Sequence, residues 1–141
     1  MNSLDTIPAG FSPKKPAVLL VDDEPPLLDV FAVALAPYFE VVLAHSVREA
    51  DFALQKGPFK VVVADHLMPG GNGMEFLIRA RQEFPHMQRV LVSGYLKPEM
   101  LMRSASEAAL FRFLLKPVAI GELVRVVQEA AKAHDVSATA A

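Results

Sequence analysis

Five short apolar runs alternate with helix-like segments along the chain, and this alternation narrows the possible folds more than any other feature. The runs are rich in Val and Leu and mostly continuous, which is typical of strands buried on both faces of a parallel sheet. Between them, apolar residues recur at helical spacing. Strand and helix alternating five times predict an α/β fold: a doubly wound, five-stranded parallel sheet with five helices and right-handed crossovers. The predicted strands are Ala17–Val21, Glu40–Ala44, Lys60–Ala64, Arg89–Val92 and Phe111–Leu115.

Several predicted helices carry local start signals. Ser46–Glu49 has the pattern of a capping box, and Asn72–Glu75 is a similar start for the next helix. Pro25–Pro26 suits a first helical turn, where a missing N–H costs little. A fourth helix is expected within 97–108, although its apolar Met100–Met102 are consecutive rather than periodic.

Length and composition limit the class of protein. A chain of 141 residues suits one domain, predicted over 17–134, between a proline-rich flexible arm (1–16) and a flexible tail (135–141). A net charge of −2 leaves no basic footprint for direct nucleic-acid binding. The absence of cysteine excludes disulfides and thiolate chemistry. No apolar run reaches the ~18 residues of a membrane helix, and the first 16 residues lack the apolar h-region of a signal peptide, so we expect a cytoplasmic protein without membrane contact.

Acidic, hydroxyl and basic side chains follow four of the predicted strands. Asp22 and Asp23 come after the first strand, Asp65 after the third, Ser93 after the fourth and Lys116 after the fifth. In parallel sheets, ligands bind beyond the carboxyl ends of the strands. Neighbouring carboxylates repel one another unless a cation joins them, and an oxygen-only set suits Mg²⁺. Together these residues predict a site where a carboxylate attacks phosphorus.

Taken singly, most of these signals have plainer explanations. Asp22 to Glu24 alone would suit an acidic helix N-terminus, and Ser93-Gly94 alone is more often a turn. Asp65 is harder to dismiss, because a carboxylate that ends a buried strand needs a partner. His66 has no ligand-spaced partner and is interpreted as a loop residue. The prediction therefore depends on the joint placement of the set.

With Met68-Pro69, Gly73 and Pro117 added, the set resembles the response-regulator receiver domains of two-component signalling. We expect either a single-domain type without an output domain or a receiver excised from a longer protein. The resemblance runs from about Val18 to His134 and implies a flavodoxin-like fold. It also implies a phosphorylation-dependent switch that catalyses only its own phosphorylation and dephosphorylation.

The resemblance assigns roles to the strand-end residues. Asp65 would be the phosphoacceptor, and Lys116 would pair with the phosphoryl group. Asp23 and Asp65 would bind Mg²⁺ through their side chains, Leu67 through its backbone carbonyl, and Asp22 mostly through water.

The same resemblance assigns the switch. Ser93 would be the hydroxyl that moves toward the phosphate, and Phe113 the aromatic that follows it inward. Pro117 would follow a cis peptide that aims the preceding lysine inward. Leu67 and Tyr95 would flank the path of the hydrolytic water; since neither is an acid or amide, we expect slow dephosphorylation.

The expected partners are a sensor histidine kinase or phosphotransfer protein and a downstream protein that contacts the fourth helix, fifth strand and fifth helix. One alternative is a receiver-like binding module that acts without phosphorylation. A less favoured alternative is a small Mg²⁺-dependent phosphohydrolase, which usually has a second acid two residues after the nucleophile, where Leu67 stands. A dinucleotide-binding domain is disfavoured because Gly-x-Gly-x-x-Gly is missing after the first strand.

Overall fold

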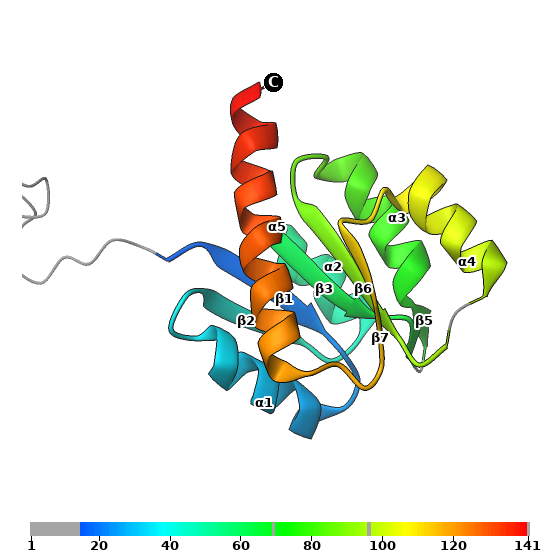
Figure 1. Ribbon diagram of the computed structural model, residues 1–141, viewed down its shortest axis with the longest axis horizontal. Coiled ribbons are helices and arrows are strands. Elements are labelled where there is room, and N and C mark those ends of the chain that lie inside the picture. The colour runs from blue at the N-terminus through cyan, green and yellow to red at the C-terminus, as the bar shows by residue number, and fades with distance from the viewer. Residues whose placement is uncertain (1–14, 69, 96, 141) are drawn as a thin grey trace, which may run out of the picture.

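The computed structural model describes residues 15–68, 70–95 and 97–140, and shows strands and helices alternating as predicted (Figure 1). A π-helical segment, Ser104–Ala108, directly follows the fourth helix. The elements in chain order are β1 (Ala17–Val21), α1 (Pro25–Leu35), β2 (Glu40–Ala44), α2 (Val47–Leu54), β3 (Val61–Asp65), β4 (Leu67–Met68), β5 (Gly71–Asn72), α3 (Gly73–Glu83), β6 (Gln88–Ser93), α4 (Pro98–Arg103), the π segment, β7 (Arg112–Leu115) and α5 (Ile120–Ala140).

The main sheet has five parallel strands in the order β2-β1-β3-β6-β7. Its register aligns Val21 at the end of β1 with Ala64 of β3, and Asp65 with Val92 of β6. The chain passes outward from β1 to β2 and then returns to place β3 on the other side of β1. The strand order therefore reverses between β1 and β3, where doubly wound sheets bind their ligands.

Helices cover both faces of this sheet (Figure 1). Helices α1 and α5 pack on one face, and α2, α3 and α4 pack on the other. Successive strand residues alternate between the two cores: in β1, Val18 and Leu20 face α1 and α5, whereas Leu19 and Val21 face the opposite layer. Every residue of β3 is buried, which explains the continuous apolar run Val61 to Ala64 in the sequence.

The helix starts follow the sequence signals. The Ser46 hydroxyl accepts a hydrogen bond from the Glu49 amide at 3.1 Å. The Asn72 side-chain oxygen accepts from the Met74 amide at 2.8 Å and the Glu75 amide at 3.2 Å. Both N-caps are confirmed, and α1 has proline in its first turn as predicted. These caps satisfy amides that have no partner within the helix.

The fourth helix is shorter than expected because its second half changes type. Regular α-helix ends at Arg103, and the π segment continues to Ala108. Met100 is buried against the sheet, while Leu101 and Met102 are exposed. Leu101 and Met102 are therefore apolar residues outside the buried face of the helix, and for this reason the apolar residues of 97–108 do not follow helical spacing.

At the C-terminus, α5 continues through 135–140, residues that the sequence analysis assigned to a flexible tail. Two side-chain contacts hold these last turns: Lys60 Nζ lies 2.6 Å from Asp135 Oδ1, and His86 Nδ1 lies 2.9 Å from Ser137 Oγ. Most of the predicted N-terminal arm, residues 1–14, lies outside the described residues. Within the described part, no helix is both long and apolar enough to cross a membrane.

Candidate functional site

Three aspartates meet where the strand order reverses. Asp22 and Asp23 follow β1, and Asp65 ends β3. Each offers one carboxylate oxygen, and these three oxygens lie within 4.8 Å of one another. Asp22 and Asp65 are both only 7% exposed. The structure thus brings the predicted acidic set together in a largely buried position.

Lys116 supplies the positive charge of this site from the loop after β7. Its Nζ lies 3.0 Å from Asp65 Oδ1, and the Lys116–Pro117 peptide is cis, as predicted. Burial alone would lower the pKa of Lys116, but the hydrogen bond and charge of Asp65 and the charge of Asp22 outweigh it, so the pKa is raised. The lysine therefore remains an ammonium beside the central carboxylate.

Asp22 has a raised pKa in the folded chain. Burial raises its pKa from 3.8 to about 6, and the neighbouring Asp65 charge adds to the shift. A hydrogen bond from the Glu24 amide to Asp22 Oδ1, at 2.9 Å, and the charge of Lys116 oppose the shift without cancelling it. A cation bound here would offset a repulsion that the chain alone leaves unbalanced.

The donor set fits a hard divalent cation. The three clustered side chains offer only oxygen atoms, and Mg²⁺ is typically held by one or two carboxylates together with waters and a phosphate. The orientation of the Leu67 carbonyl follows from the short β4–β5 ladder. In the β4–β5 ladder Leu67 pairs with Asn72, and the Gly73 amide donates to the His66 carbonyl at 2.7 Å. The alternation of antiparallel bonds therefore directs the Leu67 carbonyl away from β5.

Gly73 allows this hairpin to approach the site. A Cβ atom at this position would lie 1.9 Å from the Asp65 carbonyl oxygen. Real side chains do not tolerate such a contact, so the close approach requires glycine. The residue eight positions after Asp65 must therefore be glycine, because a larger residue would clash with the Asp65 backbone carbonyl.

Ser93 lies at the end of β6 and is only 2% exposed. Its hydroxyl donates to the Tyr95 carbonyl at 3.0 Å and accepts from the Tyr95 amide at 3.4 Å. The hydroxyl is therefore engaged with its own loop. The Tyr95 ring lies edge-on to His66, with 6.2 Å between ring centroids, and the Lys97 ammonium lies 5.5 Å from the same ring.

His66 lies in the bend between β3 and β4, in a loop as the sequence analysis interpreted it, but its burial was not predicted. It is only 8% exposed, and within the described part of the chain its Nδ1 has no hydrogen-bond partner. Burial lowers its pKa, against the opposing charge of Asp65. The signal that could have found it is its place directly after a fully buried strand.

The remaining predicted residues lie around the rim of the site or in the sheet beyond it. The Leu67 side chain is 53% exposed. Phe113 of β7 is half-buried and packs with the core under α3 and α4. A hollow of about 410 Å³ next to Lys116 is lined by Leu27, Phe31 and Val118 among others, and gives the site an open side.

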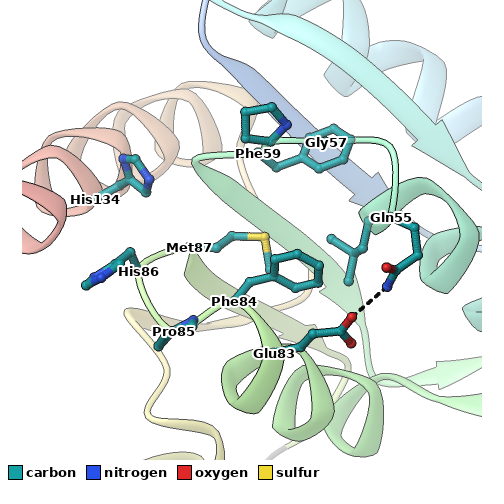
Figure 2. Close-up of a pocket in the computed structure, with 11 residues that line it drawn as sticks. Gln55, Gly57, Phe59, Glu83, Phe84, Pro85, His86, Met87 and His134 are labelled. Atoms are coloured by element: carbon teal, nitrogen blue, oxygen red, sulfur yellow. Dashed lines mark hydrogen bonds between the residues drawn. The ribbon is translucent and has the colours of Figure 1, made fainter.

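A second hollow of about 420 Å³ lies at the amino ends of β3 and β6. Figure 2 shows its aromatic and apolar lining, including Phe59, Phe84 and Met87, with a hydrogen bond of 2.8 Å between Gln55 and Glu83. None of the clustered aspartates lines it, so the charged site belongs to the opposite edge of the sheet.

Comparison with known proteins agrees with this geometry. The model of the response regulator receiver domain matches residues 18–128. The chain belongs to this family. The receiver domain is 34% identical over 123 residues to the hydrogenase transcriptional regulatory protein HoxA of Cupriavidus necator, a match that covers 87% of this chain and 26% of HoxA. It is also 29% identical over 113 residues to the response regulator protein PilR of Pseudomonas aeruginosa. This match covers 79% of this chain and 25% of PilR.

The receiver domain therefore spans about a quarter of the length of these curated relatives. Among solved structures, a CheY-like response regulator receiver domain protein from Methanospirillum hungatei aligns with a TM-score of 0.83 at 25% identity, over 88% of this chain and 99% of that one. A structure described as adenylate cyclase from Rhodopirellula baltica aligns with a TM-score of 0.82 at 30% identity, over 89% of this chain and 93% of that one. The predicted fold is confirmed.

Proposed function

We propose that this receiver domain is a cytoplasmic signalling switch that accepts a phosphoryl group on Asp65 from a sensor histidine kinase or phosphotransfer protein. The observation that carries the proposal is the surroundings of Asp65. Its carboxylate is buried at the switch point of the sheet, 3.0 Å from the Lys116 ammonium and clustered with Asp22 and Asp23.

These residues divide the work of phosphoryl transfer. An Asp65 carboxylate oxygen forms the new bond to phosphorus, while the bond from phosphorus to the donor nitrogen breaks and its electron pair stays on that nitrogen. Lys116 neutralises charge on the phosphoryl oxygens. Asp22, Asp23, Asp65 and the Leu67 carbonyl would hold Mg²⁺, which when bound supplies further charge neutralisation. We propose no enzymatic activity beyond this self-modification and its reversal.

The response to phosphorylation would begin at Ser93. Its hydroxyl would exchange the Tyr95 backbone for a phosphoryl oxygen, and Phe113 would follow it inward. The face formed by α4, β7 and α5 would then dock a downstream protein rather than nucleic acid. Three exposed apolar side chains on this face support the proposal: Leu101 (48% exposed), Met102 (72%) and Leu115 (49%).

Two side chains near the phosphoacceptor suggest a slow reversal. Leu67 and Tyr95 are, respectively, two residues after Asp65 and two after Ser93. Neither offers a carboxylate or an amide that would orient a hydrolytic water. We therefore propose a long-lived phosphorylated state, with the Tyr95 ring lying beside His66 and Lys97.

The proposal is tested by labelling with a small phosphodonor in the presence of Mg²⁺. Asp65→Asn keeps the side-chain shape but removes the attacking anion, so its label should vanish while the far-UV circular dichroism stays native. Asp29→Asn removes an exposed aspartate of α1 and serves as the matched control. Equal labelling of Asp65→Asn and Asp29→Asn would exclude Asp65 as the acceptor. An unlabelled wild-type domain that still binds its partner would favour the phosphorylation-independent alternative.

A further inference from the structure

A buried arginine at the amino end of β6 binds the end of the π segment. Arg89 is only 4% exposed. Its guanidinium donates to the Ala108 carbonyl at 2.8 Å, to the Ala109 carbonyl at 3.2 Å and to the Met87 carbonyl. All three acceptors are backbone carbonyls, two of them at the point where the helical segment ends. The cation thus satisfies groups that a helix C-terminus leaves unpaired.

The segment that Arg89 holds is in a costly conformation. Ala109 has φ 44°, in the left-handed region that is unfavourable for residues other than glycine. Its amide and that of Leu110 both donate to the Ser104 carbonyl, which closes the π turn. π-Helical turns are rare and occur frequently at functional sites. This conformation therefore depends on contacts from outside the segment.

Two further arginines supply such contacts. Arg81 of α3 donates to the Ser106 carbonyl at 3.2 Å and to the Glu107 carbonyl at 3.0 Å. Arg103 bridges Glu75 of α3, at 2.6 Å, and Glu107, at 2.5 Å. These two arginines are partly exposed, so Arg89 is the only buried member of the set and the one least screened by water.

The same strand holds both ends of the α4–π unit, residues 98–108. Ser93 and Arg89 are four residues apart on β6 and point to the same face, roughly 13 Å from each other. Ser93 binds the Tyr95 backbone just before α4, and Arg89 binds the carbonyls just after the π segment. A change in the hydrogen bonds of Ser93 would therefore act near the start of the α4–π unit, whose end is held by Arg89.

We propose that Arg89 and the π segment form a latch that holds the resting receiver, and that phosphorylation opens it. The proposal rests on the proposed function. When Ser93 leaves Tyr95 for the phosphoryl group, the start of α4 loses its anchor. The π segment then becomes regular α-helix, and Ala109 leaves the left-handed region. The hydrogen bonds from the Arg89 guanidinium to the Ala108 and Ala109 carbonyls break as a result.

Two substitutions far from Asp65 should then shift its chemistry in opposite directions. The probe is beryllofluoride with Mg²⁺, a mimic of the phosphoryl group, and the readout is its apparent affinity. Ala109→Gly removes the cost of the left-handed conformation, stabilises the latch and should weaken binding by about fivefold. Arg89→Met removes the clamp and should strengthen binding by about fivefold or more. Ala36→Gly, at an exposed position with right-handed backbone, is the control and should change nothing.

Amide hydrogen exchange adds a direct readout of the latch. In the wild type, the exchange rates of the Ala109 and Leu110 amides should change once beryllofluoride binds, because both amides lose the Ser104 carbonyl as their acceptor. If Arg89→Met fails to fold, Ala109→Gly decides the matter alone. Wild-type affinity in Ala109→Gly, or unchanged exchange of these two amides, would overturn the latch and leave the proposed function intact. A wild type that does not respond to beryllofluoride at all overturns the proposed function, and the latch with it.

Discussion

Asp22→Asn should stabilise the metal-free domain, in a manner that depends on pH. The folded state raises the pKa of Asp22 from 3.8 to about 6, so between these values the folded chain retains a proton that the unfolded chain has lost. Stability therefore falls as pH rises from about 4 to about 6. At about 1.36 kcal/mol per pKa unit, the ionised Asp22 costs roughly 3 kcal/mol at most above pH 6. Asparagine removes this cost, and its side-chain oxygen can still accept from the Glu24 amide.

The assay is urea unfolding without Mg²⁺ between pH 4 and 8. The stability gain of Asp22→Asn should be near zero at pH 4 and reach its maximum above pH 6, while the exposed Asp29→Asn control should show no such rise. In the wild type at pH 7.5, Mg²⁺ at ten times its dissociation constant should add about 1.4 kcal/mol. The reasoning is refuted if Asp22→Asn destabilises the metal-free domain at pH 7.5, or if its gain does not vary with pH.

Three further changes probe the geometry around Asp65. Gly73→Ala should destabilise the fold by several kcal/mol and abolish labelling, because its Cβ would lie 1.9 Å from the Asp65 carbonyl; a native melting temperature contradicts this. Ser93→Ala should leave labelling largely intact but abolish the beryllofluoride-dependent change in amide exchange of α4, and an unchanged response removes Ser93 from the switch. The double variant Leu67→Asn/Tyr95→Glu should lose its label about tenfold faster than the wild type after donor removal, which is about 1.36 kcal/mol of barrier; equal decay contradicts the proposal that these two side chains slow dephosphorylation.

The strands and helix starts were predictable because their causes are local. β1 and β2 have the predicted bounds, because each contains a continuous apolar run; β1 is buried, and the edge strand β2 is partly buried. Ser46 and Asn72 cap their helices through contacts only two or three residues away. The clustering of the aspartates also followed from the sequence, because parallel strands bring their carboxyl ends to one edge.

Features that depend on contacts distant in sequence could not be predicted in this way. The π segment ends on carbonyls that bind Arg89, about twenty residues earlier in the chain. The last turns of α5 are held by Lys60 and His86, and nothing near 135–140 in the sequence indicates these partners. The position of Ser93 was predicted, but the bond of its hydroxyl to the Tyr95 backbone depends on the conformation of the loop after β6.

The central claim is that Asp65 itself takes the phosphoryl group with the help of a bound divalent cation. The most direct measurement is tandem mass spectrometry of peptides from the wild-type domain after incubation with a small phosphodonor, with and without a chelator. The account predicts the mass of one phosphoryl group on Asp65, present with Mg²⁺ and lost when the metal is removed. A phosphoryl group found on His66 or Ser93 instead, or one on Asp65 that forms equally well with the chelator, would contradict it.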